Sequence, residues 1–323
     1  LDLNTLLPEG ASSGAAPGSA APADTPVDLS GLRALNANVA LRAGSLVFRQ
    51  YRIADARIEA ALDNGMLKVP VLQARAWGGA LDANALADAR ANRIAVKAVA
   101  TGVNVNALLK DVAAKDILEG TGRVNVDVDT TGRSVGELRS HLRGSAALNL
   151  RDGAIKGVNL AKSLRQAKAA LSMRTDATER ARQTEKTDFS ELSASFQIAD
   201  GVARSSDLDM KSPFLRLGGD GAVDIGKGRI DYTARATVTS TAAGQGGAEL
   251  AALKGLTVPV RLTGPFEAID WKIQWSAVAA GVVQNKLEER LKERLGVKPA
   301  EGGASAPTPK EQLKEKLLKG LFK

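Results

Sequence analysis

The clearest pattern in the chain is an alternation of apolar and polar positions between residues 188 and 238. Four successive runs keep apolar or very small residues at every second position, and most of the residues between them are Ser, Thr, Asp, Arg or Lys. A period of two residues is that of a β-strand with one face turned away from water. The apolar positions are Leu192, Ala194, Phe196 and Ile198, then Leu208 and Met210, then Leu215, Leu217, Gly219, Gly221, Val223 and Ile225, and finally Ile230, Tyr232, Ala234, Ala236 and Val238.

Short turn signals separate these runs. Asp200-Gly201 and the stretch 226–228 supply glycines for tight hairpins, and Asn64-Gly65 is a strong hairpin signal earlier in the chain. The four runs therefore predict a meander of antiparallel strands with one apolar face.

Strand patterns continue almost without pause from Gly31 to Trp275. Three stretches have helical spacing instead: 104–112, 134–142 and a longer one, 159–173, with Asn159 as its N-cap. The predicted fold class is mainly β, a long curved antiparallel sheet that forms an open groove, with a few short helices and amphipathic helices at the C-terminus.

A recurring motif predicts the curvature. Two small residues followed by two large apolar ones occupy alternate positions in three strands, and glycine inside a strand favours a bend or a close approach. The three copies are Gly120, Gly122, Val124 and Val126; Gly144, Ala146, Leu148 and Leu150; and Gly219, Gly221, Val223 and Ile225.

Composition limits the ligands of such a sheet. Aromatic residues make up only 3% of the 323 residues, and the net charge of +8 is dispersed because Lys and Arg alternate with Asp and Glu. No basic stripe precedes the C-terminus, so nucleic acid is not an expected partner. The chain has no cysteine, which excludes disulfides and thiol chemistry. No apolar run is long enough to span a bilayer, and we expect an anchoring segment outside this chain, which begins at Leu1.

Few residues suggest chemistry, and each has a simpler explanation. His141 is the single histidine, at the end of a predicted short helix. Asp127, Asp129, Thr131 and Gly132 imitate the start of a calcium loop, but Leu138 stands where its glutamate belongs. Asp207 and Asp209 could form an acid pair on one strand face, but Lys211 lies on the same face, which indicates a row of solvated side chains. Gly218, Gly219 and Gly221 are too closely spaced for a dinucleotide-binding motif. We expect no catalysis, no cofactor and no metal site.

Changes in composition divide the chain into six parts. Residues 1–7 alternate like the end of a preceding β region, and 8–28 are an Ala, Gly, Pro and Ser linker. The groove domain is predicted over 29–275, an amphipathic helix over 276–296, a second linker over 297–308 and a basic amphipathic tail over 309–323.

The two C-terminal segments leave alternatives open. The helix over 276–296 either caps the open end of the sheet or lies on another surface, and the tail either contacts an anionic membrane or a partner or is a frayed, solvated end. The residues predicted for membrane or partner contact are Lys314, Leu317, Leu318, Leu321 and Phe322.

Three segments carry a resemblance to a known family. The stretches LRGSAALNLRDGAIKGVNLAKSL (142–164), TDFSELSASFQIADGVARSSDLDMKSPFLRLGGDGAVDIGKGRIDYTARATV (187–238) and GLTVPVRLTGPFEAIDWKI (255–273) resemble the C-terminal region of the AsmA family of Gram-negative envelope proteins. The resemblance covers roughly 29–275. It implies a periplasmic protein, anchored in the inner membrane by an N-terminal helix that this chain lacks, with a taco-shaped β-groove that carries phospholipid towards the outer membrane.

The expected function is therefore the non-enzymatic carriage or bridging of phospholipid between inner and outer membranes, in support of outer-membrane biogenesis. The alternative is a scaffold or regulator of outer-membrane protein assembly, with envelope proteins as partners of the same sheet. A β-rich adhesin passenger is disfavoured by the internal helices. The residues predicted to line the lipid groove are Val124, Val126, Leu148, Leu150, Leu192, Phe196, Ile198, Leu215, Leu217, Val223, Ile225, Ile230 and Tyr232.

Overall fold

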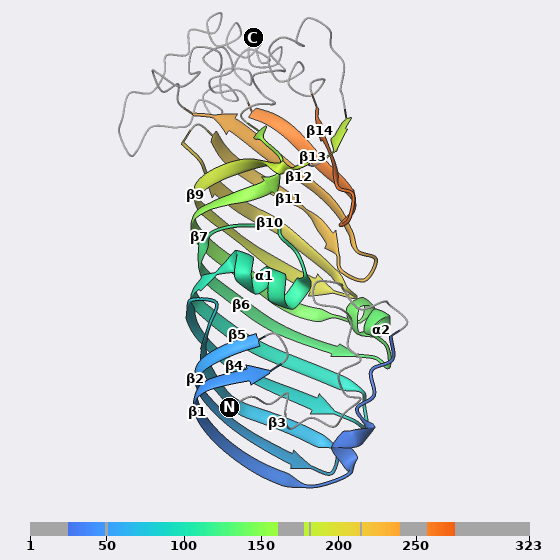
Figure 1. Ribbon diagram of the computed structural model, residues 1–323. Coiled ribbons are helices and arrows are strands. Elements are labelled where there is room, and N and C mark those ends of the chain that lie inside the picture. Colours follow the sequence, from blue (N-terminus) through green and yellow to red (C-terminus); the bar gives the residue numbers. More distant parts are fainter. Residues whose placement is uncertain are drawn as a thin grey trace, which may run out of the picture.

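A computed structural model describes residues 25–48, 51–160, 178–180, 182–213, 215–239 and 257–274. Within these residues one antiparallel sheet of 14 strands dominates, in the order β1-β2-β3-β4-β5-β6-β7-β9-β10-β11-β12-β13-β14-β8 (Figure 1). The strands are β1 (Ala37–Phe48), β2 (Tyr51–Asp63), β3 (Met66–Ala76), β4 (Gly79–Asp88), β5 (Arg93–Asn104), β6 (Thr121–Thr131), β7 (Arg143–Gly157), β8 (Thr178–Arg180), β9 (Arg182–Ala199), β10 (Val202–Lys211), β11 (Leu215–Asp224), β12 (Arg229–Val238), β13 (Thr257–Pro265) and β14 (Asp270–Ile273).

The predicted meander is confirmed. Strands β9 to β12 are sequential neighbours, and their apolar positions face one another across the ladder, as in the pairs Met210–Leu217 and Leu217–Ala236. The predicted turns also form, with positive φ at Asn64 (50°) and Asp200 (48°), each followed by a glycine of positive φ.

Two of the predicted helices lie in the described part of the chain. Helix α1 (Val105–Ala113) begins where the Asn104 side chain accepts a hydrogen bond from the Ala107 N–H, and α2 (Val135–Ser140) begins where Ser134 caps Glu137 in the same way. Such caps satisfy N–H groups that the first helical turn leaves free. The predicted helix over 159–173 lies, beyond Leu160, outside the described residues. A 3-10 turn, η2 (Ser30–Arg33), precedes β1.

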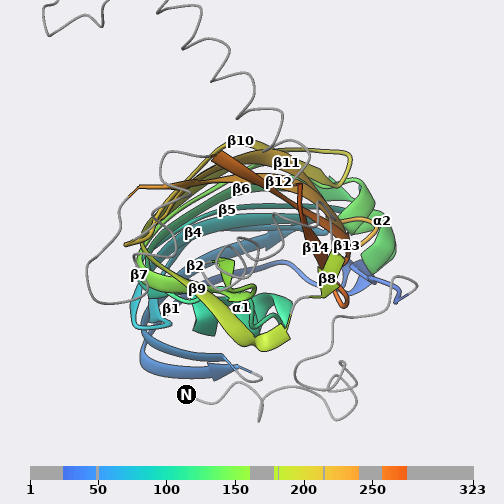
Figure 2. The ribbon, with the colours of Figure 1, turned by 90° about the horizontal axis from the view of Figure 1, so that it is seen from above.

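The sheet is strongly curved. Seen from above, the strands form an arc, and α1 lies on its open side (Figure 2). Glycine permits this curvature at Gly144, which has φ +131° and where an added Cβ would lie 2.0 Å from the Asp127 carbonyl oxygen of β6. The close approach of the two backbones explains the small residues of the recurring motif.

The C-terminal end of the sheet folds back towards its middle. Strand β8 pairs with β14, although it is followed almost at once by β9, which pairs with β7 and β10. The loop after α1 also reaches this end, because Lys115 Nζ lies 3.5 Å from Glu267 Oε1 and 5.7 Å from the centre of the Phe266 ring, both in the turn between β13 and β14.

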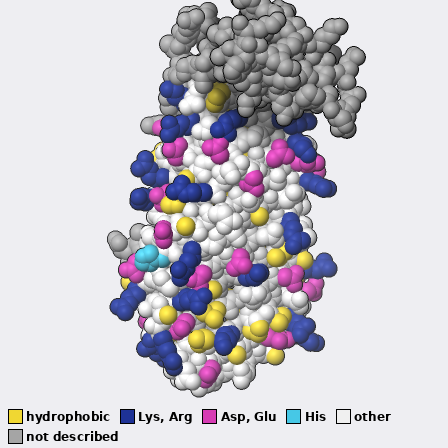
Figure 3. All heavy atoms as spheres, turned by 180° about the vertical axis from the view of Figure 1, so that it is seen from behind, with side chains coloured by type: hydrophobic (Ala, Val, Ile, Leu, Met, Phe, Trp, Pro, Cys, Tyr) yellow, Lys and Arg dark blue, Asp and Glu magenta, His cyan; other side chains and the backbone are white. Residues whose placement is uncertain are grey.

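The two faces of the sheet differ in chemistry. The convex face carries both signs of charge, dispersed over its surface (Figure 3). The main apolar core lies on the other face of the C-terminal strands, where α1 and residues 158–160 pack against it. Fully buried members include Leu150, Met210, Leu215 and Trp271.

Candidate functional site

The concave face of the sheet, called the inner wall below, is built from side chains in register across neighbouring strands. One row crosses eight strands from β1 to β9 without a polar residue: Leu41, Ile58, Leu72, Ala83, Ala98, Val126, Ala146 and Phe196.

Every member of this row, called the open row below, is neither fully buried nor fully exposed. Seven strand spacings of about 4.8 Å give the row a length of about 34 Å along the sheet. An apolar surface of that length is unusual for a protein surface that meets only water, because monomers seldom expose long contiguous apolar patches.

A second row runs beside it over ten strands and stays apolar. It consists of Val69, Ala85, Val96, Val128, Gly144, Ile198, Ala203, Val223, Ile230 and Gly264. Seven of the eighteen residues in the two rows are alanine or glycine, so much of this part of the wall carries short side chains.

A third row, nearer the other ends of the strands, is packed. It consists of Val103, Gly122, Leu150, Leu192, Met210, Leu217, Ala236 and Val258, and all but Gly122 are buried. The inner wall thus has a half-exposed part and a closed part that belongs to the core.

No charged side chain is found on the described inner wall, taken as the inward positions of β1 to Leu46, of β2 from Ile53, of β3–β6, of β7 to Leu150, of β9 from Leu192 and of β10–β14. Four of its side chains have a polar atom: Thr130, Ser205, Tyr232 and Trp271. Because an unpaired charge is costly to desolvate against an apolar wall, the surface suits an uncharged, apolar ligand.

A polar network ties α1 to the sheet beside this wall. Asp116 accepts hydrogen bonds from Asn106 of α1 and from Lys156 of β7, both at 2.6 Å. Lys156 Nζ also lies 2.9 Å from Glu119 Oε1. The ammonium group of Lys156 is the main reason why the pKa of Asp116 is far below its ordinary value, and the two carboxylates raise the pKa of Lys156.

The outward side chains form ion pairs across the strands. Lys97 and Asp127 are 3.1 Å apart, and Asp129 pairs with both Arg93 and Arg143. Further along, hydrogen bonds from Lys211 and from Arg261 lower the pKa of Glu191 and of Asp231, respectively. The charges are therefore neutralised on the wet face and contribute nothing to the inner wall.

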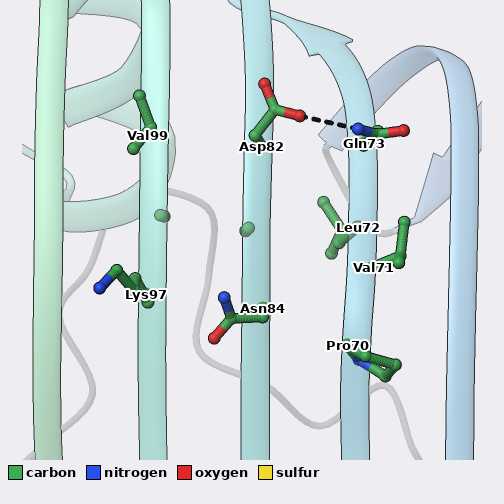
Figure 4. A pocket seen from close by; sticks show the side chains of 10 residues that line it. Pro70, Val71, Leu72, Gln73, Asp82, Asn84, Lys97 and Val99 are labelled. Carbon is green, nitrogen blue, oxygen red and sulfur yellow. Dashed lines mark hydrogen bonds between the residues drawn. The ribbon is translucent and has the colours of Figure 1, made fainter.

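A pocket of about 280 Å³ lies over β3, β4 and β5. Figure 4 shows the Gln73 amide pointing to Asp82, with Asn84 and Lys97 nearby. These four side chains are exposed and on the convex side of the sheet, and Leu72, Ala83 and Ala98 of the open row also contribute to the lining of this depression.

Comparison with known proteins identifies the family. The model of the AsmA family matches residues 9–208, well over half of the chain. The chain belongs to the AsmA family. Protein AsmA of Escherichia coli (strain K12) is 22% identical over 264 residues, which are 80% of this chain and 42% of that protein. The chain thus spans less than half the length of this curated relative, and no solved structure matches it.

In this AsmA-family chain, the predicted lining residues other than Ile225, which follows β11, share the inner wall but not the same exposure. Half-exposed positions are Val124, Val126, Leu148, Phe196, Val223, Ile225 and Ile230, while Leu150, Leu192, Ile198, Leu215, Leu217 and Tyr232 are buried. Leu150, Leu192, Leu215 and Leu217 belong to the packed core. The predicted contact residues Lys314, Leu317, Leu318, Leu321 and Phe322 lie outside the described residues.

The residues whose sequence pattern resembles a catalytic or calcium site have structural roles. His141 is the C-cap residue of α2, and its Nδ1 lies 2.9 Å from the Thr131 carbonyl oxygen. Asp127 and Asp129 are in the middle of β6 and paired with basic side chains. In the part of the chain that the structure describes, no group of three metal-ligating side chains occurs and no helix is long and apolar enough to cross a membrane.

Sequence reasoning missed the N-terminal half of the wall. Leu41, Ile58, Leu72, Ala83 and Ala98 complete the open row, although the predicted lining began at Val124. The alternation that marks these strands was present in the sequence, but their many alanines made the apolar face less distinct than in β9 to β12.

Proposed function

We propose that the chain is a non-enzymatic carrier of phospholipid in the Gram-negative envelope, with acyl chains held against the inner wall. The observation that carries this proposal is the open row, in which eight apolar side chains on eight strands are all half-exposed. The length of the row exceeds that of one extended acyl chain of ordinary length, so chains can occupy successive positions along it.

The absence of charge from the described inner wall supports the same function. A phosphate headgroup would find no cation there, whereas water beside the rim solvates it at little cost. Membership of the AsmA family supports an envelope-related function, and it is consistent with a periplasmic protein that works beside the inner and outer membranes.

Photo-crosslinking tests the proposal. A photoreactive residue at Ala83, Val126 or Phe196 should capture phospholipid in cells, and the same residue at the neighbouring outward positions Asp82, Asn125 and Gln197 should not. Equal capture on both faces would contradict a lipid groove.

The same experiment addresses the alternative of a scaffold for outer-membrane protein assembly. In that case the inward probes would yield crosslinks to protein and not to lipid. Native mass spectrometry of the gently purified chain provides an independent measurement, because co-purified phospholipid would be seen directly by its mass.

A further inference from the structure

The polar atoms of the inner wall are not scattered. Three of the four side chains that carry one, Ser205, Tyr232 and Trp271, lie in a single cross-strand row. The row runs Ser205, Gly221, Tyr232, Leu262 and Trp271 over strands β10 to β14. We call it the polar row.

The rows on either side of the polar row are apolar. One consists of Ala203, Val223, Ile230 and Gly264, and the other of Gly219, Ala234, Val260 and Ile273. The hydrogen-bonding groups therefore form a narrow band between two apolar strips of the wall.

The two hydroxyl groups of the band are satisfied by the protein. The Tyr232 hydroxyl donates to Ser205 Oγ at 3.3 Å, and Ser205 Oγ donates to Asp207 at 3.2 Å. The Tyr232 ring reaches across β11 because glycine is there: a Cβ at Gly219 would lie 2.9 Å, and one at Gly221 2.7 Å, from atoms of the ring.

Trp271 is different. Its side chain is on the inner wall, the residue is only 2% exposed, and its Nε1 has no hydrogen-bond partner among the described residues. Buried N–H groups of native proteins are almost always paired, so an unpaired indole N–H points to an acceptor that the described residues do not supply.

The charged groups around Trp271 indicate whether the acceptor of its indole N–H is charged or neutral. The basic residues nearest in sequence, Arg261 and Lys272, are opposite each other on β13 and β14 at outward positions, and no charged side chain lies on the described inner wall. A phosphate or a carboxylate is therefore a poor match, and a neutral carbonyl oxygen is a good one. Leu262, Ile230 and Gly264 are partly exposed, which leaves the wall accessible beside the indole.

From this arrangement we infer that the polar row binds the ester carbonyl of an acyl lipid, with the Trp271 N–H as donor and the apolar strips on either side in contact with the acyl chains. This inference rests on the proposed function and adds a defined position to it: an ester-linked lipid has a preferred place at the C-terminal end of the groove, between β12 and β14.

Competition between two lipids tests the inference. The unmodified chain is offered dipalmitoyl phosphatidylglycerol and its dihexadecyl ether analogue, which lacks the carbonyl groups, and the bound ratio is measured by native mass spectrometry. One neutral hydrogen bond corresponds to a preference for the ester of about three- to tenfold. Trp271→Phe should bring the ratio close to one, while Trp77→Phe, which removes an indole bonded to Asp111 elsewhere, should leave it unchanged.

Equal binding of the two lipids by the unmodified chain would overturn the inference and leave the proposed function intact. Binding of neither lipid would overturn both. A preference that survives Trp271→Phe would also overturn it. If this variant does not fold, the indole N–H resonance of Trp271 in the unmodified chain replaces it: the resonance should move downfield with the ester lipid, and an equal shift with the ether lipid would contradict the role of the carbonyl.

Discussion

The carboxylate of Asp207 accepts a hydrogen bond from the backbone N–H of Ser195 at 2.9 Å, in the stretch where β9 and β10 lose their register. The same carboxylate accepts from the Ser195 hydroxyl at 2.5 Å. In this irregular stretch the Asp207 side chain thus accepts the hydrogen bond that the Ser195 N–H would otherwise donate to a backbone carbonyl of the neighbouring strand. These hydrogen bonds with Ser195 are the main reason that the pKa of Asp207 is lowered.

Asp207→Asn should therefore destabilise the fold, since the amide can accept fewer hydrogen bonds and places an NH2 group near the Ser195 N–H. We expect a loss of about 1 kcal/mol in the free energy of unfolding at pH 7, small because the site is exposed to solvent. Urea unfolding measures it. Asp209→Asn, at an exposed position of the same strand, is the control and should change stability by less than about 0.5 kcal/mol.

The pH dependence of the stability difference between the unmodified chain and Asp207→Asn follows from the direction of the Asp207 pKa shift. A lowered pKa in the folded state means that the contribution is present above about pH 4, the ordinary value, and is lost as the pH falls through the folded-state pKa. The stability gap between the unmodified chain and Asp207→Asn should narrow in acid. A gap that is constant from pH 7 to the acid limit of folding would contradict an ionic role.

Two neighbouring glycines of β11 should respond differently to alanine. At Gly221 the new Cβ would lie 2.6 Å from the Tyr232 Cα and from the Asp231 carbonyl oxygen, whereas at Gly218 the nearest atom is 3.6 Å away. Backbone atoms cannot move aside as a side chain can, so Gly221→Ala should cost about 1–3 kcal/mol and Gly218→Ala much less. Chemical denaturation of both variants checks this, and equal losses would contradict the close packing of β12 on β11.

A charge in the open row should expel lipid. In Val126→Asp a carboxylate without a described cationic partner on the inner wall replaces an apolar side chain, with a cost of about 1–3 kcal/mol at this half-exposed position. The expected result is loss of co-purified phospholipid in native mass spectra. Asn125→Asp places the same charge one residue away on the convex face and should retain the lipid; retention in both variants would mean that acyl chains do not occupy this row.

The network around Asp116 should hold α1 in place. Asp116→Asn weakens the hydrogen bond to Lys156, so amide hydrogens of α1 should exchange faster with solvent while those of β9 to β12 keep their protection. The lowered pKa of Asp116 implies that acid has the same effect in the unmodified chain, because the attraction is lost as the carboxylate is protonated. Asp188→Asn, which affects an exposed pair with Lys186, should not change the exchange of α1.

The basic tail over 309–323 should bind anionic membranes. Its leucines and lysines have amphipathic helical spacing, and each lysine near an anionic surface contributes about 1 kcal/mol that salt reduces. Deletion of 309–323 should reduce binding to vesicles that contain phosphatidylglycerol and leave the melting temperature unchanged. A large fall in melting temperature would show instead that the tail is part of the core.

The local features of the fold followed from the sequence, and the long-range ones did not. Alternation and the Asn64-Gly65 and Asp200-Gly201 turns predicted strands that pair with their sequence neighbours, because a hairpin fixes its own register. The pairing of β8 with β14 joins segments far apart in the chain, and neither strand is long enough to show a period.

The candidate site shows the same division. Phe196, Val223 and Ile230 lie on the inner wall, but parity alone could not separate half-exposed positions from packed ones such as Leu215 and Leu217. That difference depends on α1 and on residues 158–160, which pack against the third row. The bulge at Asp207 was also missed: the sequence interpretation placed Asp207 and Asp209 in one solvated row, and only the register shift shows that Asp207 bonds Ser195.

The pairing of β14 with β8 makes the two ends of the sheet different. At the C-terminal end, the strands cannot spread without breaking either the β14–β8 ladder or the contact of Lys115 with the β13–β14 turn. At the other end, β1 pairs with β2 alone among the described strands, and the segment before β1 is tied to the strand ends by hydrogen bonds from Arg33 Nη2 to the Ala89 carbonyl oxygen and from the Asn64 N–H to Asn36 Oδ1. The two ends of the sheet are thus held by different means, a backbone ladder at β14 and side-chain hydrogen bonds at the β1 end.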